Sequence, residues 1–142
     1  MENSQSTEKI KLDFKESMYA TGRRKTSIAK IWLKKGTGKI FVNGKNFQDY
    51  FSSDTHKMQI LRPFEIIDQA TQYDVRCQVV GGGHTGQAGA MVHGISRALV
   101  KFDENFKTTL RKEKLTTRDS RAVERKKPGR AKARKSYQYS KR

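Results

Sequence analysis

The last 25 residues, 118–142, contain eleven Lys or Arg and only two acids, Asp119 and Glu124. Their net charge of +9 is more than half of the +17 carried by the whole chain. Apolar residues are too sparse here to bury a core, and the like charges repel one another. We therefore expect residues 116–142 to form a long, basic, extended C-terminal tail that requires a polyanion, foremost a nucleic acid, to neutralise it.

The apolar residues of the 142-residue chain concentrate between Tyr19 and Leu115. This distribution predicts one globular α+β domain over residues 17–115, preceded by a flexible polar extension at residues 1–16. The single cysteine, Cys77, excludes an internal disulfide framework. No apolar run approaches the ~20 residues that a membrane span needs, so we expect no membrane partner.

Three segments have the residue pattern of strands. In residues 26–33, Ala29, Ile31 and Leu33 share one face. Residues 40–42 follow a glycine-containing turn, which predicts a β-hairpin between these two strands. Residues 73–80 alternate most clearly, with Val75, Cys77 and Val79 on the apolar face. The basic run from Tyr19 to Lys25 is interpreted as the approach to the first strand.

Helical spacing is clearest over residues 85–102, where one apolar stripe contains Ala88, Met91, Val92, Ile95, Leu99 and Phe102. A short helix at about residues 55–61 is predicted to be interrupted by Pro63. Asn46 and Asp103 are interpreted as N-caps of two further helices. Together these elements predict an α+β two-layer sandwich, a mixed but mostly antiparallel β-sheet with helices on one face.

The glycine-rich loop at residues 81–86, GGGHTG, lies between a predicted strand and a predicted helix. Exposed backbone N–H groups at a helix N-terminus attract anions. A nucleotide-binding P-loop would continue with Gly-Lys-Ser or Gly-Lys-Thr, whereas this sequence continues Gly86-Gln87-Ala88. Two interpretations stay open: a tight turn, or a loop that lies against an RNA backbone.

Neither a metal site nor a catalytic site is indicated. Cys77, His84 and His93 match no zinc-ligand spacing, and Cys77 is on the apolar face of its strand. We expect Cys77 to be a small buried residue and His93 a partly buried helix residue. No Ser/His/Asp arrangement or isolated pair of acids is present, so we expect no enzyme activity, no metal and no cofactor.

A second basic cluster consists of Arg23, Arg24 and Lys25. Two separated basic regions on a small domain indicate a surface that lies along a polyanion. Tyr137 and Tyr139 interrupt the charges of the tail, and aromatic rings there can stack on bases or sugars. A pI near 10.2 fits the same class of acidic partner.

Several motifs together resemble one known family. Residues 19–29 (YATGRRKTSIA) resemble its opening, and residues 81–90 (GGGHTGQAGA) with 93–99 (HGISRAL) resemble its central loop and helix. Residues 117–119 (TRD), 124–127 (ERKK) and 138–142 (QYSKR) resemble its tail. The family is the bacterial-type small ribosomal subunit protein S9 family, and the resemblance covers residues 18–142. Tyr139 departs from it, since the family often has Phe there.

The resemblance implies a fold similar to the second domain of ribosomal protein S5. It implies a structural constituent of the small ribosomal subunit that binds small-subunit rRNA in the head, beside neighbouring head proteins. It further implies that Lys141 and Arg142, at the end of the tail, contact tRNA in the peptidyl site. The implied location is cytoplasmic and ribosome-bound in a bacterium, or on the ribosome of an organelle.

The motifs and the basic clusters together give the candidate rRNA-binding residues. These are Arg23, Arg24, Lys25, Gly82, Gly83, His84, Arg118, Arg121, Arg125, Lys126, Lys127, Arg130, Lys132, Arg134, Lys135, Tyr137 and Tyr139. Composition alone leaves a general DNA-binding protein open. Fold analogy alone leaves a small phosphotransferase open, although the glycine loop lacks the expected lysine.

Overall fold

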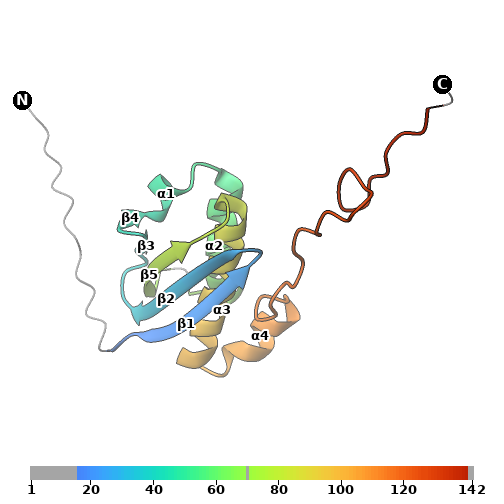
Figure 1. The fold of residues 1–142 in the computed structure, drawn as a ribbon. Helices are drawn as coiled ribbons and strands as arrows, with labels where there is room; N and C mark the ends of the chain where they lie inside the picture. Colours follow the sequence, from blue (N-terminus) through green and yellow to red (C-terminus); the bar gives the residue numbers. More distant parts are fainter. Residues whose placement is uncertain (1–15, 70, 141–142) are drawn as a thin grey trace, which may run out of the picture.

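The computed structural model describes residues 16–69 and 71–140, which form one domain and a segment that leaves it (Figure 1). The strands are β1 (Met18–Arg24), β2 (Ser27–Lys35), β3 (Ile40–Val42), β4 (Lys45–Asn46) and β5 (Tyr73–Val80). The helices are α1 (Phe47–Tyr50), α2 (Asp54–Ile66), α3 (His84–Phe102) and α4 (Phe106–Lys112). The predicted α+β class is confirmed.

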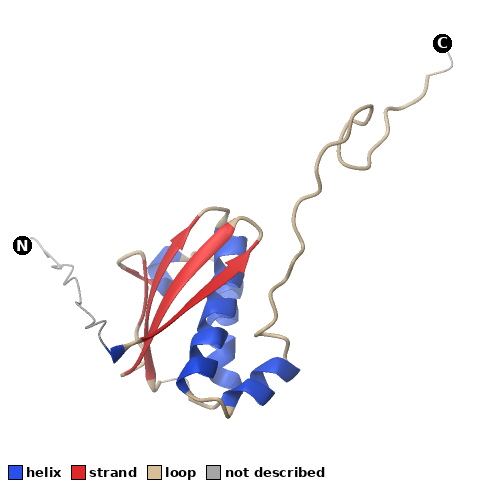
Figure 2. Cartoon of the chain, turned by 60° about the horizontal axis from the view of Figure 1, so that its bottom comes forward, coloured by secondary structure: helices blue, strands red, loops and turns tan. Residues whose placement is uncertain are grey.

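The strands form one sheet in the order β1-β2-β5-β3-β4. Neighbouring strands are antiparallel except β3 and β5, which are parallel, so the sheet is mixed as predicted. The helices gather on one face of the sheet, and no helix of the described residues lies over the other face (Figure 2). This arrangement gives two layers, with the core between the sheet and α3.

The predicted hairpin of β2 and β3 is wrong, because β5 lies between these two strands. The turn after β2 is instead bound to the beginning of β5. Oδ1 of Asp74 accepts hydrogen bonds from the backbone N–H groups of Thr37, Gly38 and Lys39 at 2.9–3.0 Å. This carboxylate holds the turn at the end of β5, and β3 then runs along the far side of that strand.

The basic approach at Tyr19–Lys25 is mostly a strand, which the sequence interpretation missed. β1 pairs with β2 from Met18 opposite Leu33 to Arg24 opposite Ser27. Its buried residues are Ala20 and Gly22. Because glycine adds nothing to an apolar pattern, the alternation was hidden.

Two helix boundaries also differ from the prediction. Pro63 lies inside α2 and does not interrupt it. Proline has no backbone N–H, so the carbonyl of Gln59 loses its hydrogen bond within the helix. Gln59 is on the exposed side of the helix, while Pro63 itself is buried. Asp103 ends α3, and the N-cap of α4 is Asn105, whose N–H donates to Asp103 Oδ1 at 3.0 Å. The predicted N-cap at Asn46 is confirmed, since its side chain accepts from Gln48 N.

Strand β1 and helix α3 approach each other so closely that their backbones touch. A Cβ atom placed on Gly22 would coincide with the carbonyl oxygen of Ala90 and would lie 2.8 Å from Gly94 Cα. Both glycines are therefore required by space, not by backbone conformation. Their contact fixes the end of β1, which carries the first basic cluster, against α3.

Candidate nucleic-acid interface

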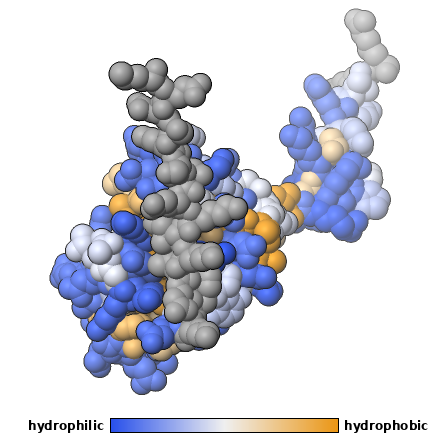
Figure 3. Space-filling view, turned by 90° about the vertical axis from the view of Figure 1, so that its left-hand side faces the viewer, coloured by the Kyte–Doolittle hydropathy of each residue, from blue (hydrophilic) through white to orange (hydrophobic). Residues whose placement is uncertain are grey.

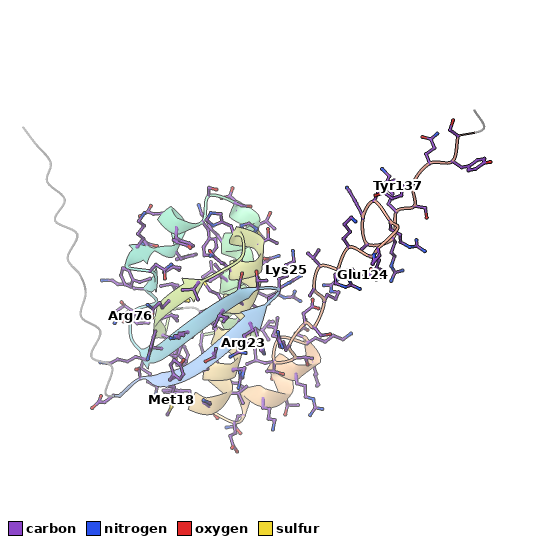
Figure 4. The ribbon with its side chains drawn as sticks, in the orientation of Figure 1. Met18, Arg23, Lys25, Arg76, Glu124 and Tyr137 are labelled. Carbon is purple, nitrogen blue, oxygen red and sulfur yellow. The ribbon has the colours of Figure 1, made fainter. Side chains whose placement is uncertain are left out.

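The structure brings the first basic cluster next to the beginning of the C-terminal tail. Arg23 and Arg24 end β1, and Lys25 follows in a two-residue turn with a positive φ of 51° (Figure 4). One terminal nitrogen of Arg24 lies 3.7 Å from a carboxylate oxygen of Asp119, near the start of the tail. The sequence predicted both regions but gave no sign that they adjoin.

A cavity of about 210 Å³ opens at this junction. Its charged lining is mostly basic and includes two side chains that the sequence did not single out, Arg62 and Lys114. The full lining is Arg23, Arg24, Gln59, Arg62, Gly89, Val92, His93, Lys114, Leu115, Thr117 and Asp119. Residues from β1, α2 and α3 thus line the cavity together with the segment after α4. These four segments are separate in the sequence, so only the structure shows that they adjoin.

Asp119 fixes the position of the cations around it. Arg121 donates to both of its carboxylate oxygens, with a shortest distance of 2.7 Å. These hydrogen bonds, with the nearby charges of Arg121 and Arg24, hold the pKa of Asp119 well below its usual range. Asp119 therefore stays ionised, and it orients Arg24 and Arg121 at the entrance to the tail.

His93, on α3, contacts both β1 and the segment after α4. Its Nδ1 accepts a hydrogen bond from the backbone N–H of Arg23 at 3.3 Å, and the ring also hydrogen-bonds to the backbone of Thr116. Partial burial, and then the positive charge of Arg97, lowers the pKa of His93. The predicted partly buried helix residue is confirmed, and it contacts both basic regions.

We expect folding stability to fall as the pH decreases from 7.5 to 5.5, and to fall less in the variant His93→Gln. The unfolded chain, with an ordinary histidine pKa of about 6.5, binds the proton more tightly than the folded protein does. The loss therefore begins below about pH 6.5 and levels off below the folded pKa of His93. Since the ring is only half buried, the difference between the two proteins should stay under about 1 kcal/mol.

Urea unfolding at a series of pH values measures this difference. The glutamine side chain of His93→Gln keeps a neutral acceptor and donor throughout, so parallel pH curves for the two proteins would contradict the assignment to His93.

The three consecutive glycines at the start of the loop have different roles. Gly81 and Gly82 have positive φ angles of 75° and 63°, and a Cβ at Gly82 would coincide with Ser27 Oγ. These two residues make the tight turn. A Cβ at Gly83 would meet nothing within 4 Å, and its φ is −100°, so neither space nor conformation requires glycine there. His84 follows, exposed, as the first residue of α3.

The tail contains a loop closed around its second acid. Glu124 accepts hydrogen bonds from Lys127 at 2.8 Å and from Arg134 at 2.9 Å, first the lysine and then the arginine lowering its pKa. The chain reverses at Pro128-Gly129, and Ala131 N donates to Lys135 O at 3.0 Å. The loop stands well away from the domain (Figure 1).

The remaining tail candidates point mainly into solvent, and the tail is largely hydrophilic (Figure 3). Tyr137 and Tyr139 have 67% and 84% of their surface exposed. The exposed cations of the described tail without an ion pair to a described acid are Arg118, Arg125, Lys126, Arg130, Lys132 and Lys135. Arg130 donates to Arg134 O and to Ser136 Oγ within the loop. Lys141 and Arg142 lie outside the described residues.

Among the described residues, Cys77, His84 and His93 do not form a group that could hold a metal ion. Cys77 is buried, as predicted, and burial raises the pKa of its thiol. Across residues 16–69 and 71–140, no three His, Cys, Asp or Glu side chains are grouped so that they could hold a metal ion. In the same residues, no helix has both the length and the apolar character required to cross a membrane.

Comparison with known proteins gives a consistent result along the chain. The family model described as "Ribosomal protein S9/S16" matches residues 22–142. The chain is 55% identical over 132 residues to "Small ribosomal subunit protein uS9" of Rickettsia canadensis, covering 93% of this chain and 82% of that relative. It is 54% identical over 136 residues to the protein of the same name from Rickettsia felis, covering 96% and 84%. The chain therefore belongs to the ribosomal protein S9/S16 family.

Proposed function

We propose that this protein is a structural constituent of the small ribosomal subunit that binds small-subunit rRNA in the head. The observation that carries the proposal is the family match, which continues through the tail to residue 142. Relatives named as small ribosomal subunit proteins align over more than nine-tenths of the chain. Because the family is structural and non-enzymatic, the phosphotransferase alternative is set aside.

The geometry supports an rRNA interface in two parts. The first part is the junction around the cavity, where Arg23, Arg24, Arg62 and Lys114 face one opening. The second is the tail, whose exposed cations follow a path away from the domain. Arginine and lysine contacts to phosphates give affinity without reading sequence, as binding along a folded rRNA requires. Gly83 leaves room for a backbone to approach the N-terminus of α3.

The proposal assigns the end of the tail to tRNA in the peptidyl site, on the ribosome in the cytoplasm. The resemblance of residues 138–142 to the family's tail carries this assignment. The planar fork of Arg142 can donate two hydrogen bonds to one phosphate, and Lys141 adds a second charge. Such contacts hold any tRNA alike, since they touch its backbone only.

Removing Lys141 and Arg142 should leave assembly intact and weaken tRNA binding in the peptidyl site. Loss of two charge-assisted contacts at an exposed site predicts an affinity lower by about three- to thirtyfold. The measurement is tRNA binding to small subunits that carry either the full or the shortened chain. Both forms should remain with the subunit through a high-salt wash.

Three results distinguish the parts of this proposal and its alternative. Unchanged tRNA affinity in subunits that retain the shortened chain would contradict the role of the tail end. A full chain that washes off the subunit at high salt would contradict the ribosomal proposal as a whole. Equal binding to duplex DNA and to small-subunit rRNA would favour the general DNA-binding alternative.

A further inference from the structure

The face of the sheet that no described helix covers carries a row of aromatic and basic side chains, of which only Tyr19 lies within the sequence motifs. Tyr19 of β1 is opposite Trp32 of β2, Trp32 is opposite Arg76 of β5, and Arg76 is opposite Phe41 of β3. Their neighbours on the other face are buried against the helices, and these are Ala20, Ile31, Val42 and Cys77. Because side chains alternate between faces, the row points to the side of the sheet on which no described helix lies (Figure 2).

The side chains of this row pack in an ordered way. The ring centroids of Tyr19 and Trp32 are 5.3 Å apart at an interplanar angle of 49°. The guanidinium carbon of Arg76 lies 5.7 Å from the centroid of the Trp32 ring. The hydroxyl of Thr21 donates to Tyr19 Oη at 3.2 Å, which restricts the tyrosine ring. Tyr19 nevertheless keeps 42% of its surface exposed, and Arg76 is exposed.

The charge of this face is positive. Lys30 points to the same side as the row and is exposed, and Lys34 on that side is partly exposed. Asp74 is the one acid in the described strands that faces this way. Its carboxylate accepts hydrogen bonds from three backbone N–H groups of the turn after β2. The partial positive charges of these groups therefore balance its negative charge.

We propose that this face is a second RNA site, at which an unpaired nucleobase stacks against Tyr19 and Trp32 while Arg76 and Lys30 contact the flanking phosphates. The inference rests on the proposed function, since it assumes that the partner is RNA. Aromatic rings interleaved with cations fit both the base and the phosphate of a nucleotide. Protein–protein interfaces also favour Tyr, Trp and Arg, but they are depleted of Lys, and here Lys30 and Lys34 flank Trp32 on the same face.

Trp32 is the only tryptophan in the chain, so its fluorescence reports on this face directly. The full chain is titrated with a ten-nucleotide oligoadenylate and, separately, with inorganic polyphosphate of equal charge. We expect the oligonucleotide to quench Trp32 and the polyphosphate to leave it unchanged, because only the former carries bases. Labelled oligonucleotide should bind the variant Trp32→Leu about tenfold more weakly than the unsubstituted protein. The variant Trp32→Phe should retain most of the affinity, since it keeps an aromatic ring.

Three results would overturn the inference. Equal effects of both anions on Trp32, with unchanged RNA affinity in Trp32→Leu, would show that RNA binds elsewhere, and the proposed function would stand. No binding of RNA by the full chain would overturn the site and the proposed function together. If deletion of residues 1–15 increases acrylamide quenching of Trp32 and RNA gives no protection, the face is covered by the chain's own N-terminal segment.

Discussion

The variant Gly22→Ala should lose about 3 kcal/mol of folding free energy, at the upper end of what an added methyl group costs in a packed interior. The new Cβ would coincide with the carbonyl oxygen of Ala90 and with the backbone nitrogen of Gly94. Both are backbone atoms of α3, and neither can rotate away as a side chain would. Strand β1 must then move off the helix, together with Arg23 and Arg24. Urea unfolding followed by circular dichroism measures the loss.

Two other glycines provide graded controls for this result. In Gly94→Ala the Cβ would meet Cγ1 of Ile31 at 2.6 Å, a side-chain atom that can partly give way, so we expect a smaller loss. In Gly83→Ala the Cβ meets nothing within 4 Å, and we expect a change of less than about 1 kcal/mol. If Gly22→Ala unfolded at the same urea concentration as Gly83→Ala, the backbone contact between β1 and α3 would be refuted.

The strands and helices predicted correctly are those in which apolar residues repeat at a regular spacing along the whole element. β5 alternates without a break, and the apolar stripe of α3 continues along the whole helix. The hairpin of β2 and β3 failed because its turn is held by Asp74, a residue far along the chain. β1 was missed because Gly22 contributes to the core by its small size and not by its hydrophobicity.

The same nonlocal effects limited what could be predicted of the interface. Charge alone located Arg23 and Arg24 as well as the tail, since counterion release depends only on the number and density of cations. That His93 and Asp119 join these regions depends on how α3 packs. The row from Tyr19 to Arg76 was invisible for a related reason: the predicted hairpin put β3 beside β2, where β5 and Arg76 actually lie.

Deletion of residues 118–142 should weaken binding to small-subunit rRNA by about a thousandfold or more at ~150 mM salt. It removes eleven cations and two acids, which lowers the net charge from +17 to +8. If about six cations contact phosphates, the slope of log affinity against log salt becomes shallower by about four to five, at about 0.7–0.9 per contact. Folding stability should change little, because the ion pair Arg24–Asp119 that joins the described tail to the domain is long, at 3.7 Å, and both side chains are partly exposed.

Filter binding across a salt series measures the slope. Deletion of residues 1–15 is a suitable control, since that segment contains three acids and three lysines and carries no net side-chain charge. It shortens the chain without changing the electrostatics. Identical slopes for the full chain and the tail deletion would contradict the assignment of the tail to rRNA.

The position of the cations, and not only their number, should decide the affinity. Changing Arg125, Lys126, Lys132 and Lys135 to Gln removes four charges of the tail that have no ion pair with a described acid. Changing Lys39, Lys45, Lys107 and Lys112 to Gln removes the same charge from the domain, outside the proposed interface. If the tail tracks rRNA phosphates, the first variant lowers the salt slope by about three and the second by less than about one. Equal losses would mean that net charge alone attracts the RNA, and that the tail has no defined path along it.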